Sequence, residues 1–320
     1  AVLAAALVSS LAAATFMRNR TYGSAETMWR DVMRKAPHNL RQQVALAADL
    51  NRQGRYGEAE SMARGLVAGM KKALQSGKRP RHSIAATDPH VLYPEALQVL
   101  GLALLGRGEI RQATDCFREG VQLTPTRRLY HNLGVALMQD GRTEEALKAI
   151  DSAILLEAGN SASWFFRACL LSEAGRSREA VLAYGKAIEL DPRSLGPRVD
   201  LAWLLATCPD DGVRDGERAV ELAESIVGIS GVHSVRGFDV LAAAYAEAGK
   251  LKEAVEAAGK ALALFREEMT RSSAGGLAKP EKSDREAELD ARLAVYQNGQ
   301  AYRAAGRAAY GRDSEMEHRR

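Results

Sequence analysis

The chain has 320 residues, and its 44 Lys and Arg residues nearly balance its 40 Asp and Glu residues, so the formal net charge is only +4. This balance excludes the strong single-sign field of a dedicated nucleic-acid binder. The chain is rich in Ala and Leu, with 9 Pro and 6% aromatic residues, which is typical of helices and unlike a β-sandwich or a disordered chain. We therefore predict an all-α protein.

The first element in the chain is a hydrophobic segment over residues 1–17, which carries no charge before Arg18. A helix of this length reaches about 25 Å, the short end of a membrane span. We predict a truncated transmembrane helix here, with the core of a signal peptide and an Ala-rich soluble helix as alternatives. The transmembrane interpretation implies that the N-terminus tethers the chain to a membrane.

A helical repeat follows the hydrophobic segment. Each copy has a small residue, a second small residue twelve positions later, and a Gly between them, as in Gly134, Gly141 and Ala146. Gly134 recurs as Ala168, a period of 34 residues, which predicts pairs of antiparallel helices. The small residues allow the two helices to approach closely, and the Gly relieves the backbone where the chain reverses. On these residues the chain resembles the tetratricopeptide repeat (TPR) family, which implies a right-handed α-solenoid.

The copies of the repeat divide the chain. The first copy is represented only by its second helix, over 21–36. Four full units follow at 40–73, 94–126, 127–160 and 161–194. The fifth unit begins at 195, and the sixth covers 235–268. The predicted segments are first TPR helices over 21–73, a basic loop over 74–93, a TPR array over 94–268, a linker over 269–285, a capping helix over 286–303, and a flexible tail over 304–320. The fifth unit has a stretched turn over 207–216, in which we expect Asp215 to cap the next helix.

Three segments resemble a more specific family. Residues 18–39 contain Trp29, Pro37 and Asn39 and are similar to the junction in bacterial multipass O-mannosyltransferase-like, transmembrane-and-TPR membrane proteins. Residues 203–226 and 291–303 resemble the end of such arrays. The resemblance implies a docking module of a membrane glycosyltransferase whose catalytic part lies upstream, at the extracytoplasmic side of a bacterial inner membrane. The arginines beside residues 1–17 favour the cytoplasmic side instead.

No catalytic motif is present in the sequence. There is no GxSxG elbow, HExxH pair, phosphate-binding loop or dinucleotide fingerprint. Three Cys without CxxC spacing and six His without ligand spacing predict neither a disulfide framework nor a metal site. We predict that the chain is not an enzyme, needs no cofactor and binds no nucleic acid. The basic run over 71–82 is interpreted as a solvated loop.

Stacked helix pairs predict a groove lined by the first helix of each pair, and peptides or partner helices bind such grooves. The candidate partner-binding residues at inward positions are Arg41, Gln98, His131, Asn132, Phe165, Phe166, Asp200, Trp203 and Asp239. An alternative interpretation is that the three aromatic residues in this set pack between repeats instead of binding a partner. We predict a non-catalytic scaffold that binds a protein or peptide partner in the groove, with a secreted soluble TPR adaptor as a further alternative.

Overall fold

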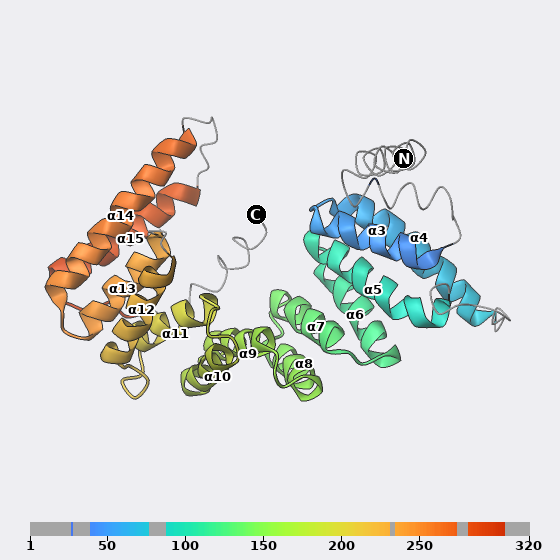
Figure 1. Ribbon diagram of the computed structural model, residues 1–320, viewed down its shortest axis with the longest axis horizontal. Coiled ribbons are helices and arrows are strands. Elements are labelled where there is room, and N and C mark those ends of the chain that lie inside the picture. Colours follow the sequence, from blue (N-terminus) through green and yellow to red (C-terminus); the bar gives the residue numbers. More distant parts are fainter. Residues whose placement is uncertain (1–26, 28–38, 77–87, 231–233, 274–280, 305–320) are drawn as a thin grey trace, which may run out of the picture. The chain divides into compact units, whose positions relative to one another are not determined.

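The structure is a computed structural model that describes residues 27, 39–76, 88–230, 234–273 and 281–304. Across these residues the chain forms thirteen α-helices in succession and no strand (Figure 1). The prediction of an all-α chain built from helix pairs is confirmed. The helices are α3 (Leu40–Arg52), α4 (Tyr56–Gln75), α5 (Pro89–Gly106), α6 (Ile110–Leu123), α7 (Arg127–Gln139), α8 (Thr143–Leu156), α9 (Ser161–Glu173), α10 (Ser177–Leu190), α11 (Gly196–Thr207), α12 (Gly216–Ser230), α13 (Val235–Glu247), α14 (Leu251–Ser273) and α15 (Glu281–Gln297).

The helices divide into two compact units, unit 1 over residues 1–156 and unit 2 over residues 157–320. We call the first helix of each pair helix A and the second helix B. Within a unit, A helices contact helix B of their own pair and helix B of the pair before, as α5 contacts α6 and α4. Neighbouring A helices also contact each other, α3 against α5 and α11 against α13. Within each unit, the A helices therefore share one face.

Small residues permit the close approach of helices A and B. A Cβ atom added at Gly134 would lie 2.6 Å from Cδ1 of Ile150, and one added at Gly101 would lie 2.5 Å from Cε1 of Phe117. The equivalent Ala168 is completely buried. These positions therefore have the packing role that the repeat pattern predicted.

Glycine also ends the A helices, as predicted from the repeat. The turn glycines have φ between +73° and +78°, a left-handed conformation that disfavours residues with a Cβ atom. After Gly249, the N–H of Lys250 donates to the carbonyl of Tyr245 at 2.8 Å and closes the turn. The residues that share this conformation are Gly54, Gly108, Gly141, Gly175 and Gly249.

The stretched turn of the fifth pair has the same closing main-chain bond, since the N–H of Asp215 donates to the carbonyl of Leu205 at 3.0 Å, and side chains brace its longer loop. Residues 208–215 connect α11 to α12, and Arg214 donates to Oε1 of Glu247 at 2.8 Å. The carboxylate of Asp215 accepts the N–H of Arg218 at 3.0 Å, so the predicted helix cap is confirmed. Arg214 thus links the longer loop to α13.

The predicted basic loop over 74–93 is too long at both ends. Helix α4 continues to Gln75, and α5 begins at Pro89, where the Asp88 side chain caps it by accepting the N–H of His90 at 2.9 Å. Pro94 lies inside α5 instead of preceding the helix. The predicted loop ran past Asp88 and Pro89, although this pair is a favourable helix start. Asp is a good helix cap, and Pro is tolerated in the first turn.

The predicted linker over 269–285 and capping helix over 286–303 also need correction. Helix α14 continues to Ser273, and α15 begins at Glu281 and ends at Gln297. Helix α15 contacts α14, as expected of a cap (Figure 1). Residues 300–304 are not helical, because Gly299 takes the same left-handed turn as the A-helix glycines, with φ of +74°.

Within the described ranges, none of the helices combines the length and the apolar character that a membrane span requires. The hydrophobic segment over 1–17, most of the lone helix over 21–36 and the tail beyond Ala304 lie outside the described residues. What the sequence indicates about these segments therefore stays a prediction.

Candidate partner-binding surface

Four of the predicted groove residues lie on the A helices of unit 1. Arg41 on α3 is exposed, whereas Gln98 on α5 and both His131 and Asn132 on α7 are half-buried. Gln98 and His131 hold the same place in successive repeats, three residues before the small residue that faces helix B. Because α5 contacts α7, the A-helix face of unit 1 carries a row of polar side chains. Their role in binding stays a prediction.

The imidazole of His131 is neutral at physiological pH. Burial, with a smaller contribution from the charge of Arg127, lowers its pKa from 6.5 to about 4. Because Nδ1 is buried, a ligand can meet only the other ring nitrogen, which carries no positive charge. It cannot attract an acidic peptide by charge at neutral pH.

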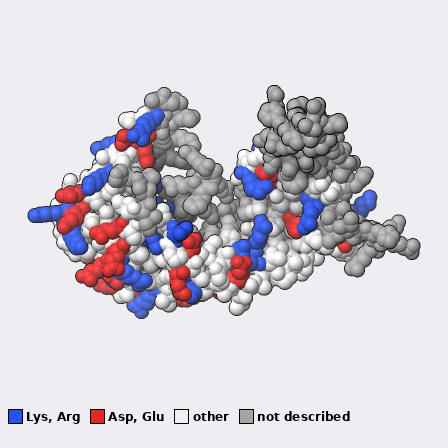
Figure 2. Space-filling model, in the orientation of Figure 1, with Lys and Arg blue, Asp and Glu red and all other residues white. Residues whose placement is uncertain are grey.

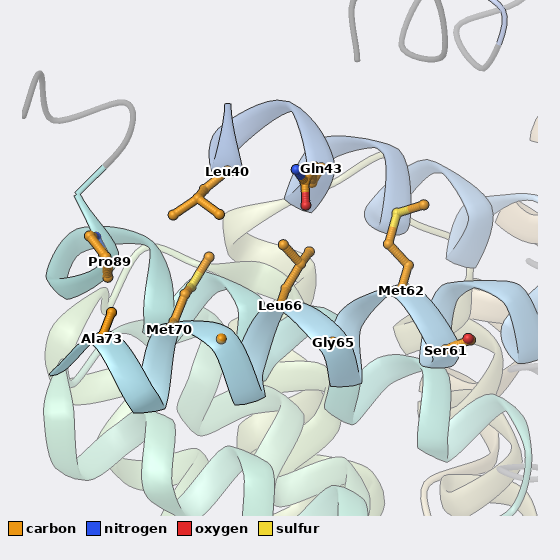
Figure 3. A pocket seen from close by; sticks show the side chains of 10 residues that line it. Leu40, Gln43, Ser61, Met62, Gly65, Leu66, Met70, Ala73 and Pro89 are labelled. Atoms are coloured by element: carbon orange, nitrogen blue, oxygen red, sulfur yellow. The ribbon is translucent and has the colours of Figure 1, made fainter. Parts of the chain in front are cut away.

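An apolar pocket lies between α3 and α4 in unit 1 (Figure 3). Leu40 of α3 and the side chains of Leu66 and Met70 of α4 point into it, and Gly65 leaves the wall open between them. The repeat pattern did not predict this pocket. Its signal was the recurrence of small residues at every fourth position on one helix face, Ser61, Gly65, Gly69 and Ala73.

In unit 2, Phe165 packs between helices. Its ring centroid lies 6.1 Å from that of Tyr184 on α10, and a Cβ atom added at Gly196 of α11 would lie 3.3 Å from its ring. Phe165 is half-buried, as is the neighbouring Phe166. The contacts of Phe165 match the alternative interpretation, in which this aromatic side chain belongs to the packing between repeats.

The prediction of an open partner-binding groove needs correction at Asp200, Trp203 and Asp239, because other residues of the chain bury these side chains. Their exposed fractions are 6%, 3% and 2%. Asp200 pairs with Arg236 of α13, and Asp239 pairs with Arg292 of α15 at 2.8 Å. Arg236 of α13 therefore covers Asp200, whereas Arg292 of α15 and Tyr302 cover Asp239 and Trp203. The repeat position identified them as groove-facing, but it could not show that a later part of the chain fills that groove.

Burial keeps Cys169 of unit 2 and Cys116 of unit 1 protonated. Cys169 Sγ lies 4.0 Å from Asp200 Oδ2 and 3.7 Å from Tyr184 Oη, and burial holds the thiol pKa well above its usual value. Burial also raises the pKa of Cys116 to about 11. Both residues are therefore thiols at physiological pH, whereas nucleophilic attack needs the thiolate.

Residues 300–304, which we call the covering segment, cross α13 and α11 after the turn at Gly299. The Tyr302 ring packs on Trp203 with 5.9 Å between centroids, and Arg303 pairs with Glu247 at 2.7 Å. The N–H of Ala304 donates to the carbonyl of Thr207, the last residue of α11, at 3.0 Å. The repeat pattern did not predict this arrangement. The sequence signal for it was Gly299, which follows its helix in the same way as the earlier turn glycines follow theirs.

Charged side chains give this surface no single-sign field. Figure 2 shows Lys and Arg side chains interspersed with Asp and Glu on the face of unit 2 that is in view. Among the described residues, no group of three or more His, Cys, Asp or Glu is placed to hold a metal ion. The surface therefore offers hydrogen bonds, aromatic rings and single ion pairs.

The comparisons with known proteins agree with this geometry. The model of the tetratricopeptide repeat family matches residues 128–160 and 161–194. The chain contains tetratricopeptide repeats. Helices α7 and α8 make up the first matched TPR and α9 and α10 the second, each with its turn glycine. No curated protein matches the chain in sequence.

Solved structures share the TPR fold at low sequence identity. A tetratricopeptide repeat protein from Parabacteroides merdae ATCC 43184 is 14% identical and has a TM-score of 0.53, over 87% of this chain and 96% of that chain. The APC/C hetero-tetramer Cut9–Hcn1 is 15% identical and has a TM-score of 0.51, over 75% of this chain but only 42% of that one. Likeness at this identity shows the fold alone. The resemblance of residues 18–39 to transmembrane-and-TPR proteins stays a prediction.

Proposed function

We propose that the chain is a non-catalytic TPR scaffold that binds a protein or peptide partner along its A helices. The observation that carries this proposal is the row of half-buried polar side chains on unit 1, formed by Gln98 on α5 and by His131 and Asn132 on α7. The two helices touch, so one extended ligand reaches all three side chains.

The chemistry of the row suits a peptide main chain. Each peptide unit of an extended ligand offers one donor and one acceptor. The amides of Gln98 and Asn132 each offer both, and the neutral imidazole of His131 adds one ring nitrogen, since its Nδ1 is buried. Hydrogen bonds of this kind position a ligand, and apolar contacts beside them supply most of the binding free energy.

Selection of peptides from a random displayed library against the full chain tests this function. Peptides that bind should lose roughly tenfold in affinity for the double variant His131→Ala, Asn132→Ala, since two or more neutral hydrogen bonds are removed. The matched control is Lys148→Ala, an exposed residue of the B helix α8. A library without binders, or an equal loss in the control, would contradict the proposal.

We further propose that residues 1–17 tether the scaffold to a bacterial inner membrane, with the repeats on the extracytoplasmic side. The uncharged sequence of this segment supports the tether. Docking for a membrane glycosyltransferase is the finer form of this proposal, and its support is the resemblance of residues 18–39.

Flotation with phosphatidylcholine vesicles tests the tether. The full chain should float, and the variant Leu7→Arg, Leu11→Arg should not, because each central arginine costs about 2.5–3.5 kcal/mol on insertion. A full chain that stays in the aqueous fraction would favour the secreted adaptor instead.

A further inference from the structure

The covering segment contacts the A helices of unit 2 through a dipeptide, Tyr302 and Arg303. Helices α11 and α13 touch each other and share the A-helix face, so the segment lies where the repeat pattern predicted a ligand. Each of its three contacts is of a kind that a peptide from another protein can make.

The first contact is an aromatic platform. The Trp203 ring lies 5.9 Å from that of Tyr302, at a tilt of 42°. The guanidinium of Arg292 lies 5.6 Å from the Trp203 centroid and 5.8 Å from the Tyr302 centroid, so it stabilises both rings. Asp239 fixes Arg292 through two hydrogen bonds of 2.9 and 2.8 Å. The platform is therefore rigid on the protein side, and it accepts a flat aromatic side chain.

The second contact is a carboxylate held in place for a guanidinium. Glu247 Oε2 lies 2.7 Å from Nη1 of Arg303, and Glu247 Oε1 accepts from Nε of Arg214 at 2.8 Å. The Glu247 side chain is 14% exposed. Because Arg214 in the stretched turn orients this carboxylate, it needs little reordering to receive a basic side chain.

The third contact is a main-chain hydrogen bond at the end of α11. The last carbonyls of a helix lack partners within the helix. The carbonyl of Thr207 accepts the N–H of Ala304 at 3.0 Å. This contact requires only an extended backbone, so any peptide with the correct spacing can replace it.

The covering segment itself is only partly buried. Tyr302 and Ala304 are half-buried, and the side chain of Arg303 is 41% exposed. Beneath them, Trp203 and Thr207 are 3% and 2% exposed. A half-exposed ion pair contributes little to stability, so the Arg303 contact opposes displacement of the segment only weakly.

We propose that α11 and α13 form a binding site for an extended segment of a partner protein in which an aromatic residue directly precedes an arginine, and that residues 300–304 occupy this site until the partner displaces them. The inference rests on the proposed function, since it names the ligand class and the control of access for a TPR scaffold. The segment is attached a few residues from its site, so its effective concentration is high and it weakens the apparent affinity of a competitor.

The test uses a fluorescein-labelled peptide with the sequence of residues 298–304, NGQAYRA, and fluorescence anisotropy. The full chain should bind it weakly. The full chain with Tyr302→Ala and Arg303→Ala, in which the segment is released, should bind it at least about tenfold more tightly. In the released background, Glu247→Gln should reduce the affinity for the probe, and the matched control Glu221→Gln, an exposed residue of α12, should not.

Three results would overturn the inference. These are no binding of the probe to the released variant, equal affinity for the released and unchanged chains, and equal binding of a probe in which Ala replaces Tyr and Glu replaces Arg. Should the double variant misfold by circular dichroism, the single variant Arg303→Glu replaces it, because it breaks only the ion pair with Glu247.

Two further comparisons separate this inference from its alternatives. A dimer of the unchanged chain that Tyr302→Ala converts to monomer would assign the site to a second copy and overturn the partner peptide. If the probe fails while library peptides bind unit 1, the scaffold function stands and this inference alone falls. Failure of both experiments would remove the proposed function as well.

Discussion

Arg292 and Asp239 form a buried, two-hydrogen-bond ion pair that joins α15 to α13. Nε of Arg292 donates to Oδ1 at 2.9 Å and Nη2 donates to Oδ2 at 2.8 Å, with the side chains 9% and 2% exposed. Arg292 precedes Gly299 by the same seven positions that separate Ala242 from Gly249. It therefore stands where other A helices have a small residue facing helix B. In the described residues no helix follows α15, so the long side chain is accommodated.

Loss of one partner of this pair should destabilise unit 2. Arg292→Ala leaves the Asp239 carboxylate buried without its guanidinium, and we expect the free energy of unfolding to fall by about 3–5 kcal/mol in a urea titration. The double variant Arg292→Ala, Asp239→Ala should lose less than the sum of the two single losses. The control is Arg266→Ala, whose pair with Glu286 is exposed and should contribute far less to stability. Equal losses for Arg292 and Arg266 would contradict the buried role.

A side chain at Gly134 should overpack the contact between α7 and α8. A Cβ atom there would lie 2.6 Å from Cδ1 of Ile150 and 3.4 Å from the carbonyl of Ala146. We expect Gly134→Val to reduce the free energy of unfolding by about 1–3 kcal/mol. Gly185→Ala is the matched control, because it lies in α10 with open space around its Cβ position and gains helix propensity. Equal melting temperatures for wild type and Gly134→Val would show that the assigned repeat phase is wrong.

The turn glycines should be sensitive to substitution for a conformational reason alone. Gly249 has φ of +76° and no atom within 4 Å of an added Cβ, so Gly249→Ala introduces no clash. The left-handed backbone still costs an L-residue about 1–2 kcal/mol, and thermal unfolding measures this loss. Gly249→Asn should lose less, since Asn tolerates this conformation better. The control Gly259→Ala in α14 should be neutral or stabilising, and a loss there as large as at Gly249 would refute the explanation.

His131 should make the stability of unit 1 depend on pH. Its pKa is about 4 in the folded chain against 6.5 in the unfolded one, so between these values the unfolded chain binds the additional proton. Wild-type stability therefore falls as the pH decreases from 6.5 to 4. His131→Gln should remove this component, so that its stability relative to wild type increases by at most about 3 kcal/mol over the same range. Urea titrations at pH 7 and pH 4 measure the difference, and a pH-independent difference would contradict the buried imidazole.

The sequence by itself determined the repeat and its local consequences. The positions of Gly134, Gly141 and Ala146 predicted which helices pair and where the chain reverses, because both depend on residues within one repeat. The cap at Asp215 was predicted for the same reason, since it acts on an N–H three positions later. Interactions within one turn or one repeat are encoded by spacing, and spacing can be read directly.

The tertiary structure alone decided which groove positions are open. Gln98, His131 and Asn132 remain half-exposed in unit 1, whereas Trp203 and Asp239 lie beneath Tyr302 and the guanidinium of Arg292. Repeat phase assigns the same inward direction to both groups. The difference arises from contacts between residues more than fifty positions apart, as in the pair of Arg292 with Asp239, and these depend on where the chain turns after α15 and not on any local pattern.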